Sequence, residues 1–146
     1  MKITGACHCG HIRFEAEVDP GTSSICHCTD CQVLSGTAYR TAVFTLKGTF
    51  CMLGAAPKIY VKTADNGNRR QQSFCPECGT PIYSTATGDD PKVHAIRLGT
   101  INERSALAPQ SQIWCRSRLA WVDDLTAIPG TDTQAGFGAS GERTAF

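Results

Sequence analysis

The spacing of the cysteines is the feature that most constrains what this sequence can fold into. Seven of the nine cysteines fall in three short groups, which are Cys7 and Cys9, then Cys26, Cys28 and Cys31, then Cys75 and Cys78. Thiolates separated by one or two residues can face the same ion, so these patterns are typical of zinc sites. The other two, Cys51 and Cys115, stand alone in strand-like or apolar surroundings, and we predict that they are buried core residues.

The N-terminal sequence favours metal binding over disulfides, because it predicts a reducing compartment. The N-terminal stretch MKITGACHCGHIRF has neither the apolar region nor the cleavage pattern of a signal peptide, and no segment suggests a transmembrane helix. We therefore expect a cytoplasmic protein with no membrane partner, where disulfides are rare. The odd number of cysteines also argues against a complete disulfide framework. Buried free thiols or two adventitious disulfides are the alternative to metal.

The pair Cys75 and Cys78 has the form of a zinc knuckle, C-P-E-C-G. A glycine after the second cysteine can take a positive φ, which closes the turn and points backbone N–H groups at sulfur. A knuckle supplies only two ligands, and the stretch C-H-C-G at Cys7 and Cys9 has the matching form. We predict that these four cysteines form one closed, structural zinc site, whose binding energy stabilises the folded state.

The three cysteines Cys26, Cys28 and Cys31 are one short of a closed tetrahedral site. Three protein ligands and one exchangeable position are typical of a catalytic zinc. We therefore predict an open site at the second ion. The residues leave a different partition open, in which His27 ligates or Cys115 closes the site and both zincs are structural.

Most of the chain is predicted to form short strands separated by turns, with no alternation of strands and helices. This order favours a mainly β, antiparallel fold in a single domain, residues 1–128, followed by a flexible tail, residues 129–146. A turn of helix is expected at residues 29–36, and Asn66-Gly67 suits a hairpin turn. The expected strands cover residues 11–18, 36–46, 49–54, 58–63, 69–74 and 92–101.

The segment Ile113–Val122, IWCRSRLAWV, alternates apolar and polar residues and is also predicted to be a strand. Trp114 and Trp121 are then expected in the core, with the lining of a ligand pocket as the alternative. Arg116 and Arg118 would share one side of this strand, where they are candidate anchors for a substrate carboxylate.

The charge of the chain limits its partners. The formal net charge is +1 over 146 residues, which makes nucleic acid an unfavourable partner, because lysine and arginine supply most non-specific affinity for phosphates. An open three-thiolate zinc instead suits a soft fourth ligand, and a substrate thiol is the obvious one. A fourth thiolate would leave two negative charges, so nearby cations should help. Arg40, Arg69 and Arg70 are the candidates.

These motifs resemble the glutathione-dependent formaldehyde-activating enzyme family, which includes the centromere protein V-like proteins. The matching stretches are GACHCGHIRFEAEV, ICHCTDCQVLSGTAYRTAVF, RRQQSFCPECGTPIYS and, more loosely, PQSQIWCRSRLAWV. The resemblance implies a β-tent-like fold with two zinc ions, one structural and one catalytic. The ligand sets it implies are Cys7, Cys9, Cys75 and Cys78 for the structural ion and Cys26, Cys28 and Cys31 for the catalytic ion.

The resemblance also implies an activity and a partner. The family name implies condensation of formaldehyde with glutathione to S-hydroxymethylglutathione, which is classed as a carbon–sulfur lyase reaction. Family sequences often carry a histidine just before the Ile-Trp pair, and Gln112 occupies that place here. Two other hypotheses remain. One is a non-catalytic zinc-binding module, and the other is a thiol redox or metal-buffer role for the three-cysteine site.

Overall fold

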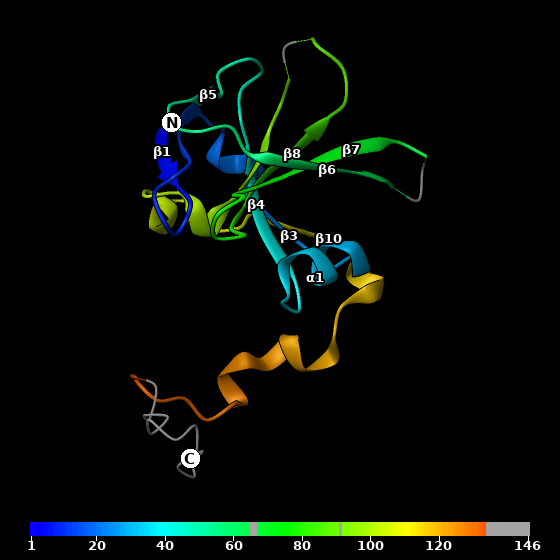
Figure 1. Ribbon diagram of the computed structural model, residues 1–146. Coiled ribbons are helices and arrows are strands. Elements are labelled where there is room, and N and C mark those ends of the chain that lie inside the picture. The colour runs from blue at the N-terminus through cyan, green and yellow to red at the C-terminus, as the bar shows by residue number, and fades with distance from the viewer. Residues whose placement is uncertain (65–66, 91, 134–146) are drawn as a thin grey trace, which may run out of the picture.

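A computed structural model of the chain describes residues 1–64, 67–90 and 92–133 (Figure 1). Strands dominate it and form two sheets, so the prediction of a mainly β fold with antiparallel sheets is confirmed. The smaller sheet has the order β1-β2-β5, built from β1 (Lys2–Ala6), β2 (Arg13–Glu17) and β5 (Cys51–Met52). Both of its strand pairs are antiparallel.

The larger sheet has seven strands in the order β10-β3-β4-β9-β8-β7-β6. All its pairs are antiparallel except the pair of β10 with β3, which is parallel. Its strands are β3 (Ser24–Cys26), β4 (Arg40–Phe44), β6 (Lys58–Thr63), β7 (Arg69–Phe74), β8 (Pro81–Ala86), β9 (Ala95–Arg97) and β10 (Ser111–Ile113).

The core forms from alternating apolar residues, as expected for half-buried strands. In and beside β2, the side chains of Ile12, Phe14, Ala16 and Val18 are all buried, as the sequence pattern predicts. They belong to one cluster that draws on both sheets and on the chain after β9. Its further members include Ile3, Val43, Ile82, Ile96, Ile101 and Leu107.

Several local predictions match the structure. Strands β6 and β7 have the bounds predicted for them, and they pair in register from Lys58↔Phe74 to Thr63↔Arg69. Gly67 between them has φ +81°, while Asn66 lies outside the described residues. The expected helical turn is α1 (Thr29–Ser35), which ends at Gly36 with φ +66°. Short 3₁₀ helices η1 (Pro20–Thr22), η2 (Leu98–Thr100) and η3 (Arg104–Ala106) complete this part of the chain.

The predicted strand over Ile113–Val122 is wrong. Only Ile113 belongs to a strand, and the chain then turns at Trp114, which has φ +58°, into the 3₁₀ helices η4 (Cys115–Ser117) and η5 (Ala120–Ala127). In Figure 1 this segment, coloured yellow to orange, passes next to α1 and then extends away from both sheets. Trp114 and Trp121 are 42% and 54% exposed, so neither is the core residue that alternation suggested.

Three further expectations fail, one in β5 of the small sheet and two in the segment after β10. Cys51 and Cys115 are exposed, contrary to the prediction that they are core residues. Arg116 lies over the Trp114 ring, with its guanidinium carbon 4.8 Å from the ring centroid. Arg118 pairs with Asp123 at 2.9 Å, so the two arginines do not share one side of a strand. The prediction failed because a segment of 3₁₀ helices and turns can also alternate apolar and polar residues.

The C-terminal prediction is only partly open to inspection. Residues 129–133 contain no helix or strand, and residues 134–146 of the expected tail lie outside the described residues. The boundary at residue 128 therefore stays a prediction. Within the described part of the chain, no helix has the length and apolar character needed to cross a membrane.

The tight packing around Gly5 in β1 can be tested by adding a side chain. A Cβ atom there would lie 2.2 Å from Phe14 Cζ of the neighbouring strand β2 and 2.4 Å from the Thr100 carbonyl oxygen in η2. We predict that Gly5→Ala lowers the free energy of unfolding by about 1–3 kcal/mol, because a buried ring and a backbone would have to move. Urea denaturation measures this change.

Gly99→Ala is the matched control, since a Cβ at Gly99 meets no atom within 4 Å. Equal denaturation midpoints for the two variants would contradict this account of the packing at Gly5.

Candidate metal centres

The structure brings Cys7, Cys9, Cys75 and Cys78 into one cluster, with all four sulfurs within 4.8 Å of one another. The Cys7 and Cys9 sulfurs are 3.5 Å apart, and the Cys9 and Cys75 sulfurs are 3.8 Å apart. Four sulfurs around a tetrahedral zinc, each about 2.3 Å from the ion, would be about 3.8 Å apart. Both the donor set and its spacing therefore fit a single zinc ion.

The local chain conformation at this cluster is that of paired knuckles. Gly10 and Gly79, which follow the second cysteine of each pair, have φ of +76° and +72°, as the sequence pattern predicts. The Ile12 N–H donates to Cys7 Sγ at 3.2 Å, and the Gly79 N–H closes its turn on the Cys75 carbonyl at 3.0 Å. One pair follows β1 of the small sheet and the other follows β7 of the large sheet, so the cluster joins the two sheets.

A second cluster contains Cys26, Cys28 and Cys31, whose sulfurs also lie within 4.8 Å of one another. Cys26 ends β3, Cys28 is the N-cap of α1, and Cys31 lies in the first turn of that helix. The Cys26 and Cys28 sulfurs are 3.5 Å apart, and the Cys31 N–H points at Cys28 Sγ at 3.4 Å. A strand end and a helix start thus aim three thiols at one point.

Within the described residues, this second cluster contains no fourth histidine, cysteine or carboxylate. His27 is 1% exposed, and its Nε2 bonds with Gln112 Oε1 at 2.8 Å rather than joining the cysteines. Cys115 is exposed and is not in the cluster either. The sequence left open whether His27 or Cys115 completes the second site. In this geometry the cysteines form one group of four sulfurs and one group of three, and neither His27 nor Cys115 joins the second group.

The thiols of the second cluster shift one another's pKa values in opposite directions. The pKa of Cys26 is lowered to about 5, chiefly because its thiolate accepts a hydrogen bond from the Cys31 thiol. The pKa of Cys31 is raised, first by that same hydrogen bond and then by burial. The positive charge of Arg40 favours the thiolate at both residues. A metal ion would replace the shared proton and hold all three thiolates.

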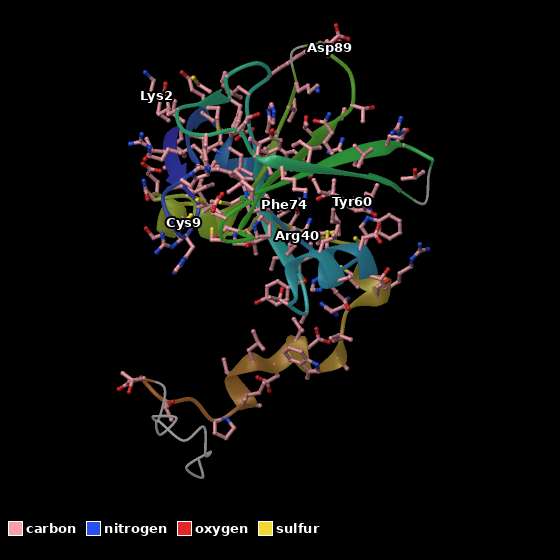
Figure 2. All side chains as sticks on the ribbon, in the orientation of Figure 1. Lys2, Cys9, Arg40, Tyr60, Phe74 and Asp89 are labelled. Carbon is pink, nitrogen blue, oxygen red and sulfur yellow. The ribbon has the colours of Figure 1, made fainter. Side chains whose placement is uncertain are left out.

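A cavity of about 360 Å³ opens onto the three cysteines. Arg40, Lys62 and Arg70 line it, whereas Arg69, the third arginine suggested by the sequence, does not. Lys62 is paired with Asp30 from α1. In Figure 2, Arg40 is labelled on β4, above α1. The remaining wall includes Leu34, Gln72, Ser84, Ile113 and Trp114.

One residue behind the cavity wall, Arg97, was missed from the sequence, whereas Arg40 was among the cations that the sequence suggested. Arg97 on β9 and Arg40 on β4 are 9% and 7% exposed, and both donate to the side-chain oxygen of Gln72 on β7, at 2.8 Å and 3.3 Å. The pKa of Arg97 is lowered to about 9, first by burial and then by the charge of Arg40. An arginine in a strand carries no sequence signal that separates a buried guanidinium from a solvated one.

Comparison with known proteins places this arrangement in a family. The family model described as glutathione-dependent formaldehyde-activating enzyme matches residues 2–117, which is most of the chain. The chain belongs to this family. The match contains both clusters of the formaldehyde-activating enzyme pattern, and it ends before η5 begins.

A solved structure supports the fold. The crystal structure of a protein from Rhodobacter sphaeroides, a structural genomics target, aligns with a TM-score of 0.55 and 17% sequence identity. The alignment covers 75% of this chain and 98% of that chain. At this identity, the likeness shows a shared fold for this formaldehyde-activating enzyme family member and carries no information about its substrate.

The two clusters predict different responses to cysteine replacement. Native mass spectrometry of freshly reduced protein should find two zinc ions per chain. Cys75→Ser should lose one ion and lower the thermal unfolding midpoint, because the buried Cys75 sulfur joins the two sheets. Cys28→Ser should lose the other ion with a smaller loss of stability.

Cys51→Ser is the control, since Cys51 is exposed and belongs to neither cluster. It should keep both ions. An equal loss of stability in the Cys28 and Cys75 variants would contradict the division between the two clusters.

Proposed function

We propose that this protein is a zinc-dependent carbon–sulfur lyase that acts on the adduct of a small aldehyde with glutathione or a similar thiol. The observation that carries the proposal is a cluster of three cysteines that faces a cation-lined cavity and includes no fourth protein ligand among the described residues. Family membership supports the choice of formaldehyde and glutathione. A cavity of about 360 Å³ is also within the usual range for small-molecule sites.

The proposal assigns different work to the two clusters. Cys7, Cys9, Cys75 and Cys78 would hold a structural zinc in a single β-tent-like domain, residues 1–128. Cys26, Cys28 and Cys31 would hold a catalytic zinc, which supplies a position where a thiol is bound as thiolate at neutral pH. All nine cysteines are free thiols rather than disulfides, which suits a reducing compartment and supports a cytoplasmic location.

The chain's own residues then orient and stabilise the reactants. Arg40 and Arg70 give the cavity wall a positive charge that would attract an anionic thiol peptide, whereas the charge of Lys62 is balanced by Asp30 in the same wall. Leu34, Ile113 and Trp114 supply apolar surface and reduce the access of water. Arg40 is the buried cation of this wall, so its charge is the least screened by solvent.

The reaction is an addition that balances without a redox partner. The thiol loses its proton, its sulfur electron pair forms a bond to the aldehyde carbon, and the carbon–oxygen π bond breaks. The resulting oxyanion takes up one proton, so that a thiol and an aldehyde give an S-hydroxymethyl thioether. In the lyase direction, the hydroxyl loses its proton, the carbon–oxygen double bond reforms, and the carbon–sulfur bond breaks.

Exchange NMR with ¹³C-formaldehyde and glutathione tests the proposal directly. The zinc-loaded protein should increase the rate of adduct formation and breakdown above the spontaneous rate. Cys28→Ser should reduce the rate to the spontaneous value, because one of the three cavity-facing sulfurs is lost.

Cys51→Ser is again the matched control and should keep the full acceleration. If the wild-type protein holds two zinc ions and gives no acceleration with any small thiol, the lyase proposal is wrong. The non-catalytic zinc module would then be the better description.

A further inference from the structure

Two buried arginines beside the three-cysteine cluster have no carboxylate partner. The ion pairs of the described residues join Lys62 to Asp30 and Arg118 to Asp123, and neither involves Arg40 or Arg97. The Nε atoms of both arginines are buried and lack a hydrogen-bond partner within the described chain. Their one shared contact is the neutral oxygen of Gln72.

The sheet register places the two guanidinium groups on the same face. Arg97 on β9 is directly opposite Ala42 on β4, and Arg40 is two residues before Ala42, so alternation returns it to the same side. Each arginine therefore adds to the electrostatic cost of burying the other. Such a pair is stable only where negative charge lies close by.

The three-cysteine cluster lies on the cavity side of this pair. The cavity onto which the cysteines open has Arg40 and Gln72 in its wall, and the carboxylate of Asp30 in the same wall is already paired with Lys62. Arg97 lies behind the wall, where it donates to the same Gln72 oxygen as Arg40. Arg40 thus lies beside the position where a fourth ligand would enter, and Gln72 connects Arg97 to it.

Formal charges show which fourth ligand would balance the site. A zinc ion with three thiolates has a net charge of −1, and a fourth thiolate makes it −2. The two buried guanidinium groups match the second value, whereas water or another neutral ligand leaves one buried positive charge unbalanced; Arg70 in the cavity wall is only partly buried and is solvated by water. Arginine keeps its charge in such a site. The Gln72 oxygen accepts a hydrogen bond from each guanidinium group and so holds both beside the cavity wall.

From this arrangement we infer that Arg40 and Arg97, positioned by Gln72, make the open zinc position select an anionic sulfur ligand over a neutral one. They are positioning and specificity-determining residues. The inference deepens the proposed function and rests on it. Binding releases one proton from the entering thiol to the buffer, and the arginines exchange none.

The test uses the full chain loaded with cobalt(II), whose sulfur-to-metal absorption reports ligation. Titration with 2-mercaptoethanol tests an anionic sulfur without carboxylates, and titration with imidazole tests a neutral ligand. We expect Arg97→Gln and Arg40→Gln each to weaken 2-mercaptoethanol binding by about thirtyfold, as loss of a nearby charge at intermediate dielectric implies. Imidazole binding should stay the same or tighten.

Two controls separate charge from general damage. Arg40→Lys keeps the charge and should retain 2-mercaptoethanol affinity within about threefold. Arg13→Gln removes an exposed arginine of the small sheet and should change neither titration. Equal weakening of both ligands by the glutamine variants, or no weakening of either, would overturn the inference.

Stability of the zinc-loaded chain without added thiol gives a second readout, which separates the charge of Arg97 from a structural role. Arg97→Met fills a similar volume without a buried charge, and replacing buried charges by apolar groups is often neutral or stabilising. We expect its unfolding midpoint to be unchanged or higher than that of the zinc-loaded wild type, while its affinity for 2-mercaptoethanol falls as in Arg97→Gln. A zinc-loaded Arg97→Met chain that fails to fold would identify Arg97 as a structural residue and contradict the inference.

The outcomes also separate this inference from the lyase proposal. If the wild-type cobalt spectrum does not respond to 2-mercaptoethanol, both are wrong. If wild type and glutamine variants respond equally, only the role of the arginines is wrong. Arginine-dependent thiol binding without turnover of formaldehyde would support the arginine inference and contradict the lyase.

Discussion

Four sulfur atoms link the two sheets at one end of the apolar cluster that both sheets share. Cys7 and Cys9 belong to the small sheet's first connection, and Cys75 and Cys78 to the β7–β8 turn of the large sheet. Without an ion, these thiols must share protons. The pKa of Cys78, for example, is lowered to about 5, first by the hydrogen bond with the Thr80 side chain. A zinc ion would hold all four as thiolates, and its binding energy would become folding energy.

Strand β7 connects the two clusters. Cys75 follows the last residue of that strand, and Gln72 lies three residues before Cys75, buried between β6 and β8. The oxygen of Gln72 accepts hydrogen bonds from Arg40 and Arg97. One strand therefore runs from the four-sulfur cluster to the arginines near the three-cysteine cluster, although the two clusters share no ligand.

The parts that could be predicted are those set by neighbours in sequence. Cysteine spacing predicted which cysteines the fold brings together in each cluster, and the β6–β7 strands were predicted to the residue because a strong turn separates two short β-prone runs. The failures involve distant contacts. The parallel pairing of β10 with β3 joins residues that are nearly ninety positions apart, and no local pattern marks it. The prediction that Trp114 and Trp121 lie in the core is wrong, since both are exposed. Alternation of apolar and polar residues does not show whether another part of the chain packs against the apolar side. The unpaired state of Arg40 and Arg97 depends on four strands, so it could be seen only in the folded chain.

The two clusters would carry the same formal charge once a thiol is bound, but the protein balances that charge in different ways. At the first cluster, Cys9 and Cys78 are exposed, so water can solvate a four-thiolate centre. At the second, the three cysteines are partly buried beneath a cavity whose wall includes a buried cation. Solvation by water acts on any ligand, whereas fixed guanidinium groups favour only a negative one. The same metal and the same ligand atom can therefore give a structural site at the first cluster and a selective binding site at the second. The difference is that mobile water balances the charge at the first cluster, whereas fixed guanidinium groups balance it at the second.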